Sequence, residues 1–409
     1  MNKKRFIVIV LDGFGVGEMD DVPLVRPADK GAATAQHILE RTAARLPELE
    51  RLGLYNVMGC CPERQSPTAT AGRCALKHFG ADTFFGHQEI MGTMPFAPVK
   101  RAFYHDLPAV KAALLAAGHQ VREAKCAGST LLVVDEAVTI GDNIEADLGQ
   151  AHNVTAALDL LPFERVVEIG GIVRSVVKVS RVIVFGGRGV SLEQLLAARE
   201  YKELCGEHYD GVNAPRSGVY QYDYQCVHLG YGVNPSVQLP TLLGARGIPV
   251  TLIGKVADIV ANPNGRSIAV VDTAQAMQYT IDAMRSGAGG FICTNIQETD
   301  LCGHRMDTAA YAAKLSIADS YLAKITEMMQ EDDVLVVMAD HGNDPTVGHS
   351  RHTREYVPLL ITGNKVQGGV NLGTRSTLAD VGATAGEYLG VALPENGSSF
   401  LSDILSDLP

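Results

Sequence analysis

The sequence predicts an α/β protein in which a mostly parallel sheet is flanked by helices. Short apolar runs have the length of buried strands, and the segments between them have the character of helices. In residues 315–329 an apolar side chain recurs at every third or fourth position, which is typical of a helix packed on a sheet. The predicted strands are residues 6–11, 250–254, 268–271, 291–295, 334–338 and 358–362.

The length of the chain predicts two domains. Its 409 residues exceed the usual limit of roughly 250–300 residues for a single hydrophobic core. Between residues 97 and 220 the pattern changes to a predicted helix at 108–117 and strands at 131–134 and 176–185. That stretch also lacks the clusters of acidic and histidine residues found elsewhere. We therefore predict a core formed by residues 1–96 and 221–409, and a smaller α/β domain inserted at 97–220.

The composition argues against several classes of function. The net charge is −11 and the chain has no basic run, so nucleic acid and anionic membranes are poor candidates for partners. The eight cysteines are scattered without CxxC spacing, and we expect neither a disulfide framework nor a structural zinc site. The apolar run at 6–11 is too short for a signal sequence, and no stretch approaches a membrane span. We therefore expect a cytoplasmic protein.

Metal-binding side chains gather directly after the predicted strand at 334–338. Asp340 and His341 come first, and Asp344, His349 and His352 follow within the next eleven residues. Carboxylate oxygens and imidazole nitrogens are ligands for divalent metals, and the end of a parallel strand is where α/β sheets bind ligands. We expect Asp344 to support the ligands or the local fold, and His349 to lie on the loop surface or at the rim of the site.

Two further strands end in residues of the same kind. Asp12 follows the strand at 6–11, and Asp300 and His304 follow the strand at 291–295. A lone Asp at the end of a strand is more often a turn former, so each residue gains weight only from the others. Because a parallel sheet brings these strand ends to one edge, we expect six ligands around two divalent ions, with Mn²⁺, Zn²⁺ and Mg²⁺ all suitable: Asp12, Asp300, His304, Asp340, His341 and His352.

Thr83 is the candidate nucleophile. It lies in the segment from Asp82 to Glu89, which contains a threonine, a histidine and two acids. A hydroxyl bound to a metal loses its proton more easily and becomes a nucleophile. The alternative is that Thr83 only forms a turn or caps a helix, as most threonines in such positions do.

These segments resemble the phosphopentomutases of the alkaline phosphatase superfamily. The match covers residues 1–96 and 225–409 in order, and only fragments of the inserted domain. The most specific part is Asp-His-Gly-Asn-Asp-Pro-Thr at 340–346 followed by His-Thr-Arg-Glu at 352–355. It is joined by IVLDGFGVGE (9–18), ADTFFGHQEIMGT (81–93), IGKVADI (253–259), GHRMD (303–307), ADVGAT (379–384) and GSSFL (397–401).

The resemblance implies an alkaline-phosphatase-like core, two ions of which Mn²⁺ is the expected metal, and a small phosphorylated metabolite, a sugar phosphate, as substrate. Thr83 would carry the phosphoryl group after its transfer from a sugar bisphosphate activator. His87, Glu89 and Asp344 would support the ligands. One ion would be held by Asp12, Thr83, Asp340 and His341, the other by Asp300, His304 and His352, and the substrate would be contacted by Lys255 and Asp147.

Three departures from the family pattern leave other functions open. Gln88 stands where the family usually has Trp, and Phe185 where the pattern suggests a phosphate-binding Arg. Asp300 and His304 are four residues apart, a spacing that resembles the cofactor-independent phosphoglycerate mutases. The first hypothesis is therefore a phosphomutase that acts through phospho-Thr83. The alternatives are a metal-dependent phosphatase or phosphodiesterase on the same core, or a metal-binding homologue without catalysis.

Overall fold

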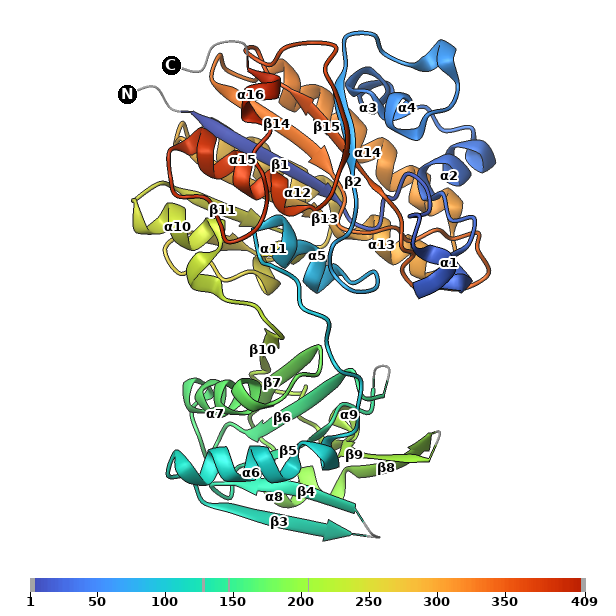
Figure 1. The fold of residues 1–409 in the computed structure, drawn as a ribbon. Coiled ribbons are helices and arrows are strands. Elements are labelled where there is room, and N and C mark those ends of the chain that lie inside the picture. Colours follow the sequence, from blue (N-terminus) through green and yellow to red (C-terminus); the bar gives the residue numbers. More distant parts are fainter. Residues whose placement is uncertain (1–3, 127–128, 146–147, 205, 406–409) are drawn as a thin grey trace. The chain divides into compact units, whose positions relative to one another are not determined.

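The computed structural model describes residues 4–126, 129–145, 148–204 and 206–405 (Figure 1). The chain divides into two compact units, residues 1–95 with 234–409, and residues 96–233. The second junction lies beyond the predicted boundary at residue 220, because strand β10 (Gln225–Gly230) pairs with β7 (Arg181–Gly187) inside the smaller unit. Within the described ranges, every helix is too short or too polar to cross a bilayer.

The larger unit contains an eight-stranded sheet with β1 near its centre. Only β15 runs against the other strands, since it pairs antiparallel with both of its neighbours while every other pairing is parallel. The predicted mostly parallel α/β class is thus confirmed. In spatial order the strands are β12 (Arg266–Ile268), β11 (Val250–Ile253), β13 (Gly290–Ile296), β1 (Arg5–Leu11), β14 (Asp333–Met338), β15 (Val357–Thr362), β2 (Thr70–Cys74) and β16 (Asn371–Arg375).

Helices cover both faces of this sheet. Figure 1 shows α15 and α10 on the near face and α12 and α14 on the far face. The apolar stripe predicted at 315–329 is buried in α14, where Leu315, Leu322 and Ile325 are fully buried. The helices of the larger unit are α1 (Val22–Val25), α2 (Thr34–Thr42), α3 (Pro47–Leu52), α4 (Leu54–Met58), α5 (Thr83–Ile90), α10 (Leu239–Ala245), α11 (Lys255–Ile259), α12 (Thr273–Arg285), α13 (Gln297–His304), α14 (Thr308–Glu327), α15 (Ala379–Leu389) and α16 (Leu401–Ile404).

The smaller unit is also α/β. Its six-stranded sheet has the order β10-β7-β6-β5-β4-β3, in which only β6 and β7 are parallel, and β8 and β9 form a separate pair. Its other elements are α6 (Leu107–Ala116), β3 (Val121–Cys126), β4 (Ser129–Val134), β5 (Val138–Asp142), β6 (Ala151–Ala157), α7 (Phe163–Val176), α8 (Leu192–Ala197), β8 (Arg199–Leu204), β9 (Glu207–Val212) and α9 (Ala214–Ser217).

The register of the central strands decides which residues meet at the edge of the large sheet. Leu11 is paired with Ile296 on one side of β1, and Val10 is paired with Met338 on the other. The chain segments that leave β13, β1 and β14 therefore start at one level, at the carboxyl ends of adjacent parallel strands. This edge is where α/β sheets bind ligands.

Candidate metal centre

The carboxyl edge of the large sheet carries the candidate site. Asp12 directly follows β1, Asp340 follows β14 after one residue, and Asp300 lies on α13, which begins where β13 ends. Lys255 is the first residue of α11, just after β11. Four adjacent parallel strands thus deliver one charged side chain each to the same place. The predicted convergence of strand ends is what the structure contains.

Asp12, Asp340 and His341 form the first group of candidate ligands. They are fully buried, and one oxygen or nitrogen of each lies within 4.8 Å of the others. Nε2 of His341 is 3.4 Å from Oδ1 of Asp12 and 3.4 Å from Oδ2 of Asp340. Neither Oδ1 of Asp12 nor Nε2 of His341 has a hydrogen-bond partner among the described residues. Because unpaired buried polar atoms are costly, this pair of atoms fits a bound cation.

A second group lies beside the first and shares His341 with it. Asp300, His341 and His352 also offer ligand atoms within 4.8 Å of one another. Nε2 of His352 is 3.3 Å from Oδ1 of Asp300 and 3.0 Å from Nε2 of His304. His304 is more exposed, and its Nε2 is 3.4 Å from Oδ2 of Asp300. The Nε2 atoms of His304 and His352 are 3.0 Å apart, and two imidazole lone pairs at that distance repel each other unless a proton or a metal ion lies between them.

The backbone fixes which nitrogen of each histidine faces the cluster. Nδ1 of His304, His341 and His352 lies against a carbonyl oxygen, those of Ser350 (2.6 Å), Gly342 (2.9 Å) and Ala81 (3.1 Å), respectively. A carbonyl can only accept, so Nδ1 carries the proton and Nε2 keeps its lone pair. This is the arrangement that orients histidine ligands in metal proteins.

Carboxyl groups outnumber the one amine in this cluster. Three carboxylates, from Asp12, Asp300 and Asp340, are buried there. Burial, followed by the charge of Asp340, raises the pKa of Asp12 to about 7, and burial lowers the pKa of His341 to about 4. Burial opposes the charge of Lys255 as well, but Asp12 and Asp300, at 3.3 and 3.4 Å from Nζ, raise its pKa. One ammonium group therefore faces three carboxyl groups, which favours divalent cations.

Thr83 touches this cluster through Asp340. Its Oγ1 donates a 2.7 Å hydrogen bond to Oδ2 of Asp340. Thr83 is half-buried and is the first residue of α5, which Asp82 caps by accepting from the backbone N–H of Phe85 at 3.0 Å. The N-terminus of a helix attracts anions, since its first N–H groups have no partners within the helix. A phosphoryl group on Thr83 would lie in that field.

His87 lies between Thr83 and strand β13. Its Nδ1 lies 2.8 Å from the carbonyl oxygen of Thr83 and 3.2 Å from Oδ2 of Asp340. Its Nε2 is 3.0 Å from Nδ2 of Asn295, which also donates to Oδ2 of Asp12 at 3.0 Å. His87 therefore contacts both Thr83 and Asp340.

Glu89 and Asp344 act at a distance from the ligands. Glu89 is fully buried and accepts hydrogen bonds from His78 on one side and Thr377 on the other. Through His78, whose Nε2 is 3.4 Å from the backbone nitrogen of Asp82, it orients the start of α5. Asp344 accepts from the backbone of Ala33 at 2.9 Å and from His37 at 2.6 Å, which fixes the start of α2.

The remaining predicted residues lie elsewhere. His349 lies on the loop that carries His352, and its Nε2 is 3.2 Å from Oδ1 of Asp29. It belongs to neither group of candidate ligands. Asp147, the predicted substrate contact, lies outside the described residues.

Three residues of the site were not singled out from the sequence. Asn295 bridges Asp12 and His87, and Asn343 donates a 2.8 Å hydrogen bond to Oδ1 of Asp300. Arg354 donates to the carbonyl groups of Leu76, His78 and Gly80, which precede Thr83. All three lie next to or within segments that resemble the family. Their hydrogen-bond partners could not be predicted, because the type of residue does not indicate which distant group it will contact.

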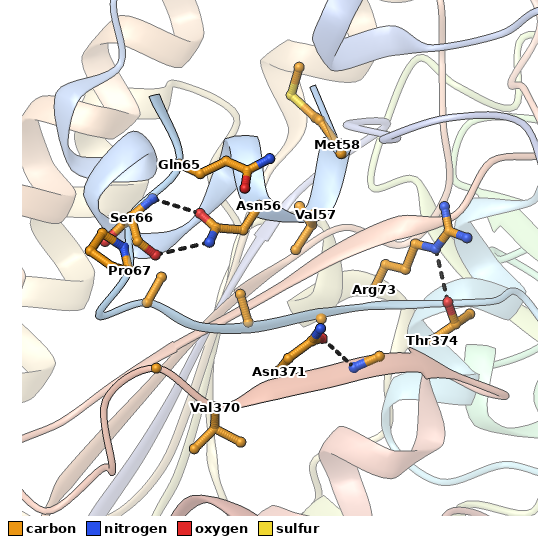
Figure 2. Close-up of a pocket in the computed structure, with 16 residues that line it drawn as sticks. Asn56, Val57, Met58, Gln65, Ser66, Pro67, Arg73, Val370, Asn371 and Thr374 are labelled. Carbon is orange, nitrogen blue, oxygen red and sulfur yellow. Dashed lines mark hydrogen bonds between the residues drawn. The ribbon is translucent and has the colours of Figure 1, made fainter. Parts of the chain in front are cut away.

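A separate pocket of about 480 Å³ lies between α4, β2 and the edge strand β16 (Figure 2). Figure 2 shows that several of its polar residues already bind other residues of the lining: Asn56 pairs with the backbone of Ser66, and Arg73 donates to Thr374. The predicted metal ligands are absent from its lining. We therefore do not take this pocket as the active site. The candidate metal ligands lie at the carboxyl edge of the sheet.

Comparison with known proteins assigns the family. A family model described as the metalloenzyme superfamily matches residues 4–393. The chain belongs to this superfamily. A phosphopentomutase of Desulfitobacterium hafniense is 33% identical over 98% of this chain and 100% of its own length. One of Acetivibrio thermocellus is 33% identical over the same shares of both chains. The predicted resemblance to phosphopentomutases is confirmed, and the chain is a metal-dependent phosphomutase of this superfamily.

Among solved structures, a phosphoglycerate mutase of Leishmania mexicana covers 98% of this chain and 97% of its own, with 14% identity and a TM-score of 0.49. That likeness is too distant to add to the assignment. The superfamily match and the two ligand groups together account for divalent metal binding at the carboxyl edge.

Removal of metal is expected to destabilise the larger unit. Without cations, the buried carboxylates of Asp12, Asp300 and Asp340 repel one another. Dialysis against EDTA should lower the melting temperature by roughly 5 °C, the size expected for the loss of ligands present well above their dissociation constants. Differential scanning fluorimetry measures the shift, and added Mn²⁺ should reverse it. An identical melting curve before and after EDTA would contradict metal binding at this cluster.

The packing of α5 against Asp340 gives a second prediction. A Cβ atom at Gly86 would lie 2.8 Å from the carbonyl oxygen and 2.9 Å from Cβ of Asp340. Gly86→Ala should therefore push α5 outward and destabilise the protein by about 1–3 kcal/mol in urea unfolding. The matched control is Gly171→Ala on α7, where a Cβ meets no atom within 4 Å. That control should be neutral or stabilising by up to about 1 kcal/mol, and equal destabilisation of both variants would contradict the close contact.

Proposed function

We propose that this chain moves a phosphoryl group between two positions of a small phosphorylated sugar, with phospho-Thr83 as the intermediate carrier. The observation that carries the proposal is the 2.7 Å hydrogen bond from Thr83 to Asp340, at the start of α5. A half-buried hydroxyl is thereby held against the metal-binding cluster. The phosphopentomutase relatives support the class of substrate.

The proposed ligand assignment places Asp12, Thr83, Asp340 and His341 around one ion. Asp300, His304 and His352 would hold the other, with His341 between the two groups. Mn²⁺ is the proposed ion, and Zn²⁺ and Mg²⁺ are the alternatives, since oxygen and imidazole ligands suit all three. The unpaired Oδ1 of Asp12 and Nε2 of His341 support this fit. When bound, such ions lower the pKa of a hydroxyl ligand and offset the charge of a phosphoryl group.

The reaction consists of two transfers through Thr83. A sugar bisphosphate activator first phosphorylates Oγ1 of Thr83. The P–O bond to Thr83 then breaks as a new P–O bond forms to a hydroxyl of the sugar phosphate, which loses its proton and becomes a bisphosphate. The other phosphate of that bisphosphate is next transferred to Oγ1, which restores phospho-Thr83 and releases the isomer. Phosphate is conserved at each step, and water takes no part.

The residues around Thr83 have separate tasks in this scheme. The N-terminus of α5 stabilises the negative charge of the phosphoryl group through the dipole of the helix. His87 holds the carbonyl group of Thr83 and so orients the first turn of the helix. Lys255, with Nζ close to both Asp12 and Asp300, is the proposed phosphate contact, because cations that neutralise those carboxylates leave its ammonium group free to bind an anion.

The location of the enzyme follows from its chemistry. We infer a cytoplasmic enzyme, because phosphorylated sugars are charged and do not cross membranes without a carrier. This placement is consistent with the net charge of −11 and with the six cysteines that the structure describes, all of which are free.

Substitution of the nucleophile tests the proposal. Thr83→Ala should lower phosphoryl transfer by roughly 10³-fold or more, because it removes the only atom that can carry the phosphoryl group at this position. Incubation with a sugar bisphosphate, followed by intact-protein mass spectrometry, should add the mass of one phosphoryl group to the wild type and none to the variant. Thr83→Ser is the matched control, since it keeps the hydroxyl and should be phosphorylated.

The fate of the phosphate separates the alternatives. With the Mn²⁺-loaded protein and a sugar phosphate plus its bisphosphate, ³¹P NMR should show phosphate moving between positions of one compound. Accumulation of inorganic phosphate at a higher rate than the isomer would instead make the protein a phosphatase or phosphodiesterase. Retained transfer in Thr83→Ala would remove Thr83 from the mechanism.

A further inference from the structure

Three aromatic side chains meet in the smaller unit. Phe185 lies near the end of β7, and Tyr220 and Tyr224 lie in the segment between α9 and β10. The ring centroids are 4.9 Å apart for the two tyrosines, and 6.3 and 6.2 Å from Phe185 to Tyr220 and Tyr224. Phe185 is buried, whereas Tyr220 and Tyr224 are 45% and 42% exposed. The cluster therefore has an apolar base and two rings open to a ligand.

A carboxylate lies at the edge of these rings. Oε2 of Glu145 accepts a hydrogen bond from the hydroxyl of Tyr220 at 3.2 Å, and Oε1 accepts from the backbone N–H of Ala214 at 2.7 Å. The two contacts hold the carboxylate in place and leave lone pairs on both oxygens. Its position beside Tyr220 is thus fixed by the chain and not by chance rotation of an exposed side chain.

Glu145 has no cationic partner in the part of the chain that the structure describes. The neighbouring cations are paired with other acids: Lys202 and Arg216 with Glu200, and Arg188 with Asp159 and Asp223. The rings and the unpaired carboxylate therefore form one electron-rich surface. It repels phosphate, because an anion would meet a carboxylate and the two exposed tyrosine rings.

We propose that Phe185, Tyr220, Tyr224 and Glu145 form a binding site for an organic ammonium group on a small molecule. A cation within about 6 Å of a ring centroid is attracted to its face, and with rings this close a single cation can meet that condition for more than one of them. Glu145 adds a charge-assisted hydrogen bond, which a protonated primary amine can donate. A quaternary ammonium group lacks that proton, so the site should prefer the primary amine.

Phe185 gives the site its specificity. The resemblance described above led us to expect a phosphate-binding Arg at this position, but the side chain there is neutral and packs against two tyrosines. A positive guanidinium in its place would sit close to the site for the ammonium group and repel it. The charge of the ligand that this part of the smaller unit can accept is therefore opposite to that of a phosphate.

The experiment is a binding titration on the full-length chain. Because it measures no phosphoryl transfer, its result does not depend on whether Thr83 carries a phosphoryl group. The probes are n-butylammonium chloride and n-pentanol, which have similar size but differ in charge, at constant ionic strength. Saturation-transfer NMR should detect n-butylammonium on the protein, with n-pentanol roughly threefold to tenfold weaker. Tetramethylammonium should lie between the two.

Variants locate the bound probe. Glu145→Gln removes the charge, and Tyr220→Leu removes one ring while keeping an apolar side chain. Each should weaken n-butylammonium binding roughly threefold to tenfold. Both residues are exposed, so the variants should fold, and thermal melting checks this. The matched control is Tyr222→Leu, because Tyr222 is 65% exposed and packs over Gly189; its affinity should be unchanged.

Several outcomes would overturn the proposal. They are undetectable binding of n-butylammonium, equal binding of n-pentanol, or an affinity that Glu145→Gln and Tyr220→Leu leave unaltered. In each case the three rings serve only to pack the loop before β10. Weakening by Glu145→Gln and Tyr220→Leu but not by Tyr222→Leu is the pattern that the proposed site requires.

Discussion

Three carboxyl groups buried side by side are the constraint on which the rest of this structure depends. Parallel strands β1, β13 and β14 end at one level, and so bring Asp12, Asp300 and Asp340 together where water is excluded. Like charges at such distances repel strongly in a protein interior, and the pKa of Asp12, raised to about 7 by burial and by Asp340, is one consequence. Lys255 lies against two of these carboxyl groups, and divalent cations in the proposed arrangement would offset the charge that remains.

The surroundings fix the side chains of the candidate ligands. Backbone carbonyl groups hold Nδ1 of the three histidines, while Asn295 and Asn343 donate to Asp12 and Asp300. Thr83 joins this framework through Asp340, and α5 keeps its position because Gly86 packs directly on the Asp340 backbone. The proposed chemistry needs such a rigid arrangement, since a carrier hydroxyl must meet both phosphates of a bisphosphate in the same geometry.

Much of the site could be predicted because its residues follow apolar runs that can only be strands. Asp12, Asp300 and Asp340 are found this way, since a parallel sheet brings strand ends together whatever its exact register. The contacts of Asn295 and Asn343 could not be predicted, because their partners, Asp12 and Asp300, are distant in sequence. The ends of elements are less accurate: the strand predicted at 176–185 begins only at Arg181 in β7, because α7 continues to Val176. The strand predicted at 268–271 is β12 at 266–268. The second junction lies after residue 233 and not at the predicted 220, because β10 returns to pair with β7.

The most direct test of this account is the metal content of the purified, Mn²⁺-loaded chain and of Asp340→Asn, measured by inductively coupled plasma mass spectrometry after exhaustive dialysis. Asp340 lies within 3.4 Å of His341 and accepts a hydrogen bond from Thr83. Loss of its charge should therefore weaken the binding of the ion in that group and leave the binding of the other ion unchanged. The account predicts about two ions per chain in the wild type and about one in the variant, from the two-ion arrangement. An equal manganese content in both proteins, or none in the wild type, would contradict it.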